Sequence, residues 1–113
     1  MKQTSLSQEA VKGLINGLLA IMESNLAAIV LYGSVARGTD SDESDVDIAV
    51  ILNNALSAEQ EDALSDLMVD LNLKYGRVFS IVDIEEKMFE QWKEILPFYK
   101  NISKDGNTLW TAA

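Results

Sequence analysis

The sequence contains no cysteine and no histidine. Without cysteine, the chain can form neither disulfide bonds nor thiolate metal sites. Without histidine, it lacks the commonest zinc ligand and the side chain that most often serves as a general base near neutral pH. The metal ligands that remain are mainly carboxylate oxygens, which are hard ligands that suit magnesium. These absences direct attention to the acidic residues.

Basic residues are scarce. The chain has 9 lysine and arginine residues against 18 aspartate and glutamate residues, which gives a net charge of −9. Binding to the backbone of a nucleic-acid duplex depends on clustered positive charge, so direct duplex binding is not expected. If the protein handles a nucleotide, a bound cation must offset much of the negative charge.

Long hydrophobic runs are missing as well. The first ten residues, MKQTSLSQEA, lack the apolar centre of a signal peptide. No apolar run reaches the length of a membrane span. We therefore expect a cytoplasmic protein that does not contact a membrane.

Length and periodicity predict one small domain. With 113 residues and 48% hydrophobic content, the chain is large enough for one core, and we expect a single domain over residues 1–113. Helical spacing and apolar runs predict the following elements: helix 7–24, strand 26–32, strand 45–50, helix 57–75, strand 77–84, helix 85–95, short helix 98–104, and an edge strand or packed tail at 108–111. This order predicts an α/β (α+β) fold, a small mixed β-sheet flanked by helices.

The most informative stretch covers residues 31–52, with the sequence LYGSVARGTDSDESDVDIAVIL. Its last part predicts a strand on which Asp45 and Asp47 alternate with apolar residues. Side chains two positions apart on a strand point to the same face, with Cα atoms about 6.5–7 Å apart. Two carboxylates so placed can bind divalent cations, and a pair of such ions can clamp the attacking and leaving oxygens of a phosphoryl or nucleotidyl transfer.

The turn before this strand supplies a second feature. Gly33 has no side chain, so a phosphate can approach its backbone closely. Ser34 offers a hydroxyl and an N–H group, and the segment from Ser34 to Arg37 can begin a short helix whose free N–H groups attract anions. The order of strand, turn, short helix, loop and acidic strand suits a nucleoside triphosphate bound with magnesium.

Simpler interpretations exist for each part. A Gly-Ser pair after a strand is most often only a turn, and two aspartates on a strand can belong to a solvated edge. The acidic run also raises the possibility of a calcium loop, which in an EF-hand starting at Asp40 requires glycine at the sixth position and glutamate at the twelfth. Asp45 and Ile51 occupy those positions, so an EF-hand is excluded. The parts taken together, in this order, favour the nucleotide site.

The two motifs Gly33-Ser34-Val35-Ala36-Arg37-Gly38 and Ser44-Asp45-Val46-Asp47-Ile48-Ala49-Val50 resemble the signature of the minimal nucleotidyltransferases, the small members of the DNA polymerase beta-like superfamily. The resemblance extends over most of the chain. It implies triphosphate contacts at Gly33 and Ser34, with Arg37 and Ser44 as further nucleotide-binding candidates. It also implies that Asp45 and Asp47 are catalytic and bind Mg²⁺ or Mn²⁺, with ATP or another nucleoside triphosphate as the substrate.

The sequence departs from this family at the third carboxylate. Catalytic members usually carry another acid on a later strand, and the expected position here is Ser80. Asp83 lies three residues further on, so on a regular strand its side chain points to the opposite face. Asp83 is a candidate third catalytic residue if a bulge or the strand end redirects it. It is equally a candidate cap for the helix that begins near Glu85.

Size and resemblance together suggest how the protein works. The chain has no room for a domain that binds an acceptor, and similar family members are often paired with a helical protein of the HEPN class. In such pairs the nucleotidyltransferase acts as an antitoxin and can add AMP to its partner. The resemblance therefore implies Mg-dependent transfer of AMP to a partner protein. The alternatives are a catalytically weak nucleotide-binding antitoxin that acts by contact, and a nucleotide sensor.

Aromatic residues gather in the last third of the chain: Phe89, Trp92, Phe98, Tyr99 and Trp110. They can be interpreted as a platform on which bases stack, or as part of the core or of an interface. Phe89 and Trp92 stand at helical spacing, which favours the core or an interface over base stacking for these two residues.

Overall fold

The computed structural model describes residues 6–38 and 45–112. In this part of the chain, four strands form one sheet in the order β3-β2-β1-β4. The strands are β1 Leu26–Tyr32, β2 Val46–Leu52, β3 Phe79–Glu85 and β4 Asn107–Thr111. β2 and β3 run parallel, whereas β1 is antiparallel to both β2 and β4. The predicted mixed sheet is therefore confirmed.

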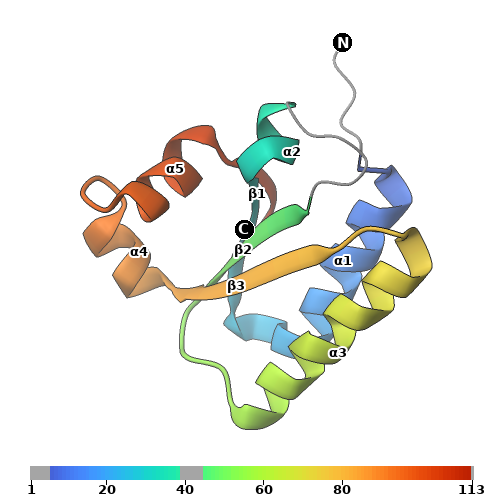
Figure 1. The fold of residues 1–113 in the computed structure, drawn as a ribbon. Coiled ribbons are helices and arrows are strands. Elements are labelled where there is room, and N and C mark those ends of the chain that lie inside the picture. Colours follow the sequence, from blue (N-terminus) through green and yellow to red (C-terminus); the bar gives the residue numbers. More distant parts are fainter. Residues whose placement is uncertain (1–5, 39–44, 113) are drawn as a thin grey trace.

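Helices cover both faces of this sheet. They are α1 Gln8–Met22, α2 Gly33–Arg37, α3 Ala58–Tyr75, α4 Glu86–Trp92 and α5 Pro97–Asp105, and a short 3-10 turn, η1 Glu23–Asn25, follows α1. α1 and α3 lie on one face, α4 and α5 lie on the other, and α2 lies at one end of the sheet (Figure 1). No helix among the described residues is both long enough and apolar enough to cross a membrane.

The alternation along β2 divides the core between the two faces. Val46, Ile48 and Val50 belong to the buried cluster beneath α1 and α3. Ala49 and Ile51 belong to the second cluster, which includes Ile102 of α5 and the half-buried Phe89 of α4. A strand that is covered on both faces has a nearly continuous run of apolar residues in its sequence. By the same alternation, Asp47 lies on the face of α4 and α5.

The helix ends follow local signals in the sequence. The side chain of Ser7 accepts a hydrogen bond from the N–H of Ala10 at 3.1 Å, which caps α1. At the start of α3, Ser57 and Gln60 form the predicted capping box. Gly76 ends α3 with φ +67°, a conformation that favours glycine. These caps explain why the two long helices begin and end close to the predicted positions.

The structure corrects or decides several predictions for the later elements. β3 begins at Phe79 rather than at residue 77, and it stays paired with β2 as far as Glu85. Glu85 is consequently the N-cap of α4, so the interpretation of Asp83 as that cap is wrong. α4 ends at Trp92, before residues 93–96 lead to Pro97 in the first turn of α5. Residues 107–111 form an edge strand, so the packed-tail alternative is also wrong.

Packing accounts for most of the aromatic residues. Phe89 and Tyr99 lie against the cluster on the face of α4 and α5, and Trp110 lies against the cluster on the opposite face. Trp92 is half-buried. The preference for packing is confirmed for Phe89. Phe98 is the exception, because 45% of its surface is exposed.

Candidate nucleotidyl-transfer site

The candidate site lies where β1 ends and β2 begins. The antiparallel register pairs Tyr32, the last residue of β1, with Asp47, the second residue of β2. Gly33 follows Tyr32 directly and starts α2. Antiparallel pairing thereby brings the Gly-Ser turn and the acidic strand to the same end of the sheet.

Gly33 is required at this position by two features of the structure. Its φ angle is +76°, a value that side-chain-bearing residues rarely adopt. In addition, a Cβ atom on Gly33 would overlap the carboxylate of Asp47. The sequence suggested that Gly33 leaves space for phosphate, and the geometry adds that Gly33 leaves space for Asp47.

Asp47 is the electrostatic centre of this group. Partial burial and the negative charge of Asp45 raise the pKa of the Asp47 carboxyl, and the positive charge of Arg37 opposes this rise. Burial and the charge of Asp47 raise the pKa of the Tyr32 hydroxyl. Asp45, Arg37 and Tyr32 therefore all lie within electrostatic reach of Asp47. Asp45 directly precedes β2 and is exposed to solvent.

α2 holds the remaining described candidates. It begins at Gly33, one residue earlier than predicted, and no side chain caps its N-terminus. Ser34 is half-buried in the first turn, and Arg37 is exposed in the last. Asn107 of β4 donates a hydrogen bond from its side-chain amide to the carbonyl of Ala36 at 3.4 Å, which ties α2 to the edge strand. Ser44 lies outside the described residues.

The structure does not bring Asp83 to this site. The parallel register pairs Asp47 with Ser80 and pairs Asp83 with Val50. Ser80 therefore occupies the place beside Asp47, whereas Asp83 lies three residues further on, on the opposite face. Burial and a hydrogen bond with Asp83 raise the pKa of Glu61, which shows that Asp83 faces α3. No bulge redirects β3, so we withdraw Asp83 as a catalytic candidate.

The acidic part of the site is accordingly a pair. Among the described residues, no group of three or more acidic side chains is arranged to hold a metal ion. Asp45 and Asp47 supply two carboxylates, and Ser80 supplies a hydroxyl at the next strand. Carboxylate oxygens are suitable ligands for magnesium, and a cation would relieve the repulsion that raises the pKa of Asp47. The donor set therefore fits a magnesium or manganese ion.

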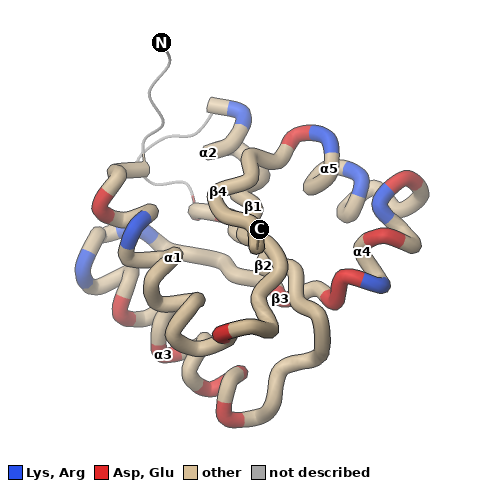
Figure 2. The backbone as a smooth tube through the Cα atoms, turned by 180° about the vertical axis from the view of Figure 1, so that it is seen from behind, with Lys and Arg blue, Asp and Glu red and all other residues tan. Residues whose placement is uncertain are grey.

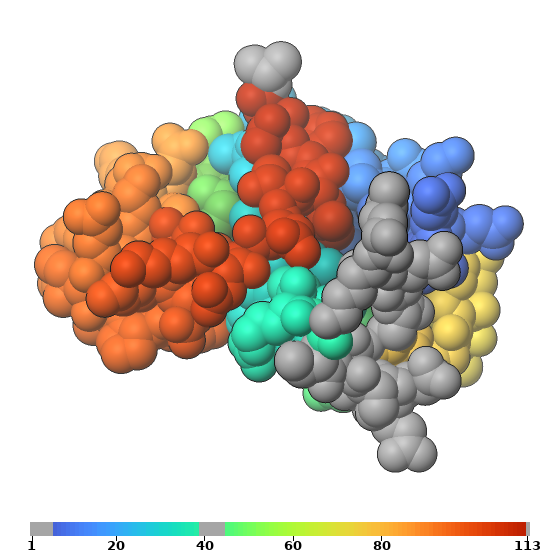
Figure 3. Space-filling model, turned by 90° about the horizontal axis from the view of Figure 1, so that it is seen from above, coloured from blue at the N-terminus to red at the C-terminus, as the bar shows by residue number. Residues whose placement is uncertain are grey.

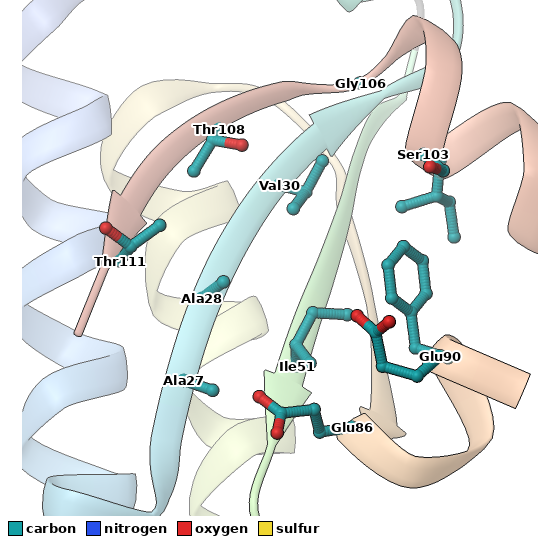
Figure 4. A pocket seen from close by; sticks show the side chains of 12 residues that line it. Ala27, Ala28, Val30, Ile51, Glu86, Glu90, Ser103, Gly106, Thr108 and Thr111 are labelled. Carbon is teal, nitrogen blue, oxygen red and sulfur yellow. The ribbon is translucent and has the colours of Figure 1, made fainter. Parts of the chain in front are cut away.

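A cavity of about 340 Å³ lies on the face of α4 and α5, towards the other end of β1. Its floor includes Ala28, Val30 and Ile51, and the side chains of Glu86 and Glu90 point towards it from α4 (Figure 4). None of the site candidates lines this cavity. This cavity and the candidate site are therefore at different places on the molecule.

Sequence reasoning missed Tyr32 as part of the site. The residue looked like the end of a strand, and only the register shows that it lies opposite Asp47. The available signal was its position directly before Gly33. A side chain at the carboxyl end of a strand, next to a glycine turn, often faces a site.

Known proteins resemble this chain along most of its length. The family model described as "Polymerase beta, Nucleotidyltransferase" matches residues 17–110, a range that contains every site candidate. A Methanocaldococcus jannaschii protein named as a "putative protein adenylyltransferase" is 31% identical over 103 residues, which cover 91% of this chain and 97% of the relative. A second protein with the same description, from the same organism, is 26% identical over 64% of this chain and 73% of its own length.

Solved structures share the fold. A toxin–antitoxin crystal structure with AMP-PNP has a TM-score of 0.64 and 24% identity, over 90% of this chain and 73% of that one. A Shewanella oneidensis complex of a tri-AMPylated HEPN toxin with its MNT antitoxin has a TM-score of 0.56 and 21% identity, over 94% of this chain and 74% of that one. At these identities the structures support the fold alone. The match to the family model over most of the chain shows more: this protein belongs to the polymerase beta-type nucleotidyltransferases, as one of their minimal members.

Proposed function

We propose that this protein transfers AMP from ATP to a hydroxyl group of a HEPN-type partner protein, with Mg²⁺ or Mn²⁺ as the cofactor. The observation that carries the proposal is the contact between Gly33 and Asp47, because it joins both halves of the nucleotidyltransferase signature at one end of the sheet. The positive charge of the Arg37 side chain, which lies near Asp47, suits a phosphate group.

Each residue has a role in this proposal. Asp45 and Asp47 hold the metal ion, which when bound offsets the charge of the triphosphate and polarises the α-phosphate. Gly33 and Ser34 contact phosphate oxygens through backbone N–H groups and the serine hydroxyl. Arg37 neutralises further phosphate charge, and Ser44 remains a candidate for nucleotide contact.

The transfer makes and breaks one bond at phosphorus. The oxygen of the acceptor hydroxyl attacks the α-phosphorus, and the bond from that phosphorus to the oxygen bridging the β-phosphate breaks. Pyrophosphate leaves, AMP stays on the acceptor oxygen, and the hydroxyl proton passes to water. Since Ser80 stands beside Asp47 where relatives usually have an acid, no third carboxylate of the described chain takes this proton.

The nucleotide and the acceptor are inferred from relatives. Two of these relatives carry the description "protein adenylyltransferase", and one structural neighbour is a complex whose HEPN toxin is tri-AMPylated.

The test uses ATP labelled at either the α-phosphate or the γ-phosphate. The protein is incubated with each ATP, Mg²⁺ and a HEPN-type protein encoded by the neighbouring gene. The α-label should appear on the partner, and the γ-label should not. Asp47→Asn should abolish the labelling, and Asp83→Asn should leave it unchanged. Absence of α-label from wild type, despite tight ATP binding, would reject the transferase proposal.

That negative result would favour a second candidate, a nucleotide-binding antitoxin that acts by contact. The observation behind it is Ser80, which leaves the site one carboxylate short of the usual family pattern. In this case the two proteins should co-elute on size-exclusion chromatography in the presence of ATP, and Asp47→Asn should weaken ATP binding without any labelled product.

A further inference from the structure

One aromatic ring near the site is not explained by packing. Phe98 is the second residue of α5, and 45% of its surface is exposed. Ile102, one helical turn further along α5, is almost fully buried at 2%. Single exposed hydrophobic residues are common on protein surfaces, so exposure alone assigns no function to Phe98. The contacts of Phe98 with neighbouring rings are what suggest a function.

Phe98 is connected to the site through Tyr32. The two rings contact each other edge to face, with centroids 5.7 Å apart. Tyr32 is paired with Asp47 across the antiparallel strands β1 and β2. The ring of Phe98 is therefore separated from the catalytic carboxylate by a single side chain.

Two further aromatic residues hold the ring of Phe98 in place. Phe98 contacts Tyr99 with centroids 5.6 Å apart, and Tyr99 contacts Phe89 with centroids 6.4 Å apart. Tyr99 and Phe89 belong to the packed cluster on this face of the sheet. This row of edge-to-face contacts fixes the orientation of Phe98 while leaving part of its surface open to solvent.

The charged residues of α2 and α5 suit an anionic ligand. α2 and α5 together carry Arg37, Lys100 and Lys104 against one acid, Asp105, whereas α3 carries five acids against Lys74. Figure 2 shows these opposite charge patterns along the backbone. α2 and α5 lie side by side, as the view from above shows (Figure 3). A triphosphate is therefore attracted to the side of the site on which Phe98 lies.

We infer that Phe98, supported by Tyr32, forms the surface on which the base of the nucleotide stacks. This inference rests on the proposed function, since it assigns the base of the same triphosphate whose phosphates lie at Gly33 and Ser34. Stacking on an aromatic ring recognises a purine through its flat face and does not require hydrogen bonds to its edge. The proposal identifies the residue that distinguishes a nucleotide from a bare polyphosphate.

The test compares ATP with inorganic tripolyphosphate by calorimetric titration in the presence of Mg²⁺. Phe98→Ala should weaken ATP binding by about 5- to 150-fold, the range expected for loss of one stacked base, and should leave tripolyphosphate binding unchanged. Phe98→Trp should preserve ATP binding. The matched control is Met88→Ala on α4, because Met88 has a similar exposure of 42% and takes no part in the row of rings.

A second measurement covers the case in which Phe98→Ala disturbs α5. The tryptophan of Phe98→Trp should lose fluorescence on addition of ATP and not of tripolyphosphate, measured against wild type. The inference is overturned if Phe98→Ala binds ATP as wild type does, or if the affinities for both ligands fall equally. If wild type binds neither ligand, the proposed function fails and the inference fails with it. If wild type binds both ligands and only the results for the Phe98 variants contradict the inference, the inference is rejected and the proposed function is kept.

Discussion

At the scale of single residues, the site depends on one close contact. Gly33 adopts a positive φ angle, and the space where its Cβ would lie is taken by the carboxylate of Asp47. The same carboxylate has a raised pKa because it is partly buried and close to Asp45. One glycine and one aspartate thus fix the distance between the turn and the strand.

Gly33→Ala should lower stability and remove nucleotide binding. The positive φ angle alone costs roughly 1–2 kcal/mol for a residue with a side chain, and the overlap with Asp47 adds to this cost. Gly76→Ala is the matched control, because Gly76 also has a positive φ of +67° but nothing lies within 4 Å of its Cβ position. Urea denaturation and ATP titration of both variants measure the two effects. If Gly76→Ala costs as much stability as Gly33→Ala and Gly33→Ala still binds ATP, the contact with Asp47 has no such role.

Asp47→Asn should stabilise the metal-free protein at neutral pH. The pKa of Asp47 in the folded protein lies above its ordinary value of 3.8. Between the ordinary pKa, which applies to the unfolded chain, and the higher pKa of the folded protein, the folded state binds more protons than the unfolded state. Stability therefore falls as the pH rises through this range. Above it, the ionised carboxylate lowers the free energy of unfolding, and asparagine removes this penalty.

Melting temperatures in a chelating buffer, from pH 7 downwards, check this prediction. The gain from Asp47→Asn should be largest at pH 7 and should shrink as the pH approaches 3.8. Asp66→Asn, at an exposed acid on α3, is the control for a general reduction of negative charge. A lower melting temperature for Asp47→Asn at pH 7 would contradict the assigned pKa direction.

At the scale of elements, the register of β3 decides which residues meet. The sequence predicted the strand, its approximate position and the expected place of the third acid at Ser80. It did not decide whether Asp83 reaches the site, because a bulge cannot be recognised from residue types alone. The regular pairing of β2 with β3 settles this point, since it continues without interruption from Val46 and Phe79 to Leu52 and Glu85.

Ser80→Asp should strengthen binding of Mn²⁺ several-fold, because affinity for a hard divalent cation rises with the number of charged oxygen ligands. The new carboxylate would stand beside Asp47 on the neighbouring strand. Asp83→Asn should leave Mn²⁺ binding unchanged, because Asp83 faces Glu61 on the other side of the sheet. Calorimetric titration of Mn²⁺ into each variant tests both statements. A large loss of affinity in Asp83→Asn would return Asp83 to the site.

At the scale of the whole molecule, the layered fold was predictable and its cavity was not. Helical spacing, capping residues and two apolar runs sufficed for the helices and the mixed sheet. The hollow beside Ala28 arises from how α4 and α5 are placed over β1 and its neighbour β4, and no local pattern encodes that placement. The exposure of Phe98 could not be predicted for the same reason, because it depends on how α5 packs against the rest of the molecule.

Ala28→Val should increase the free energy of unfolding by about 0.5–1 kcal/mol, because it fills part of the cavity and adds a β-branched residue to a strand. ATP affinity should not change, since the cavity is separate from the site. Ala55→Val, at an exposed position outside the sheet, is the control and should have little effect on stability. Chemical denaturation and ATP titration measure both quantities. Reduced ATP affinity in Ala28→Val would move the nucleotide site to the cavity.

The most direct measurement is a crystal structure of the protein with Mn²⁺ and a non-hydrolysable ATP analogue. The anomalous signal of manganese should lie between the carboxylates of Asp45 and Asp47, with the triphosphate against Gly33 and Ser34. Manganese and triphosphate found elsewhere, for example beside Glu86 and Glu90 in the cavity, would contradict the assignment of the active site.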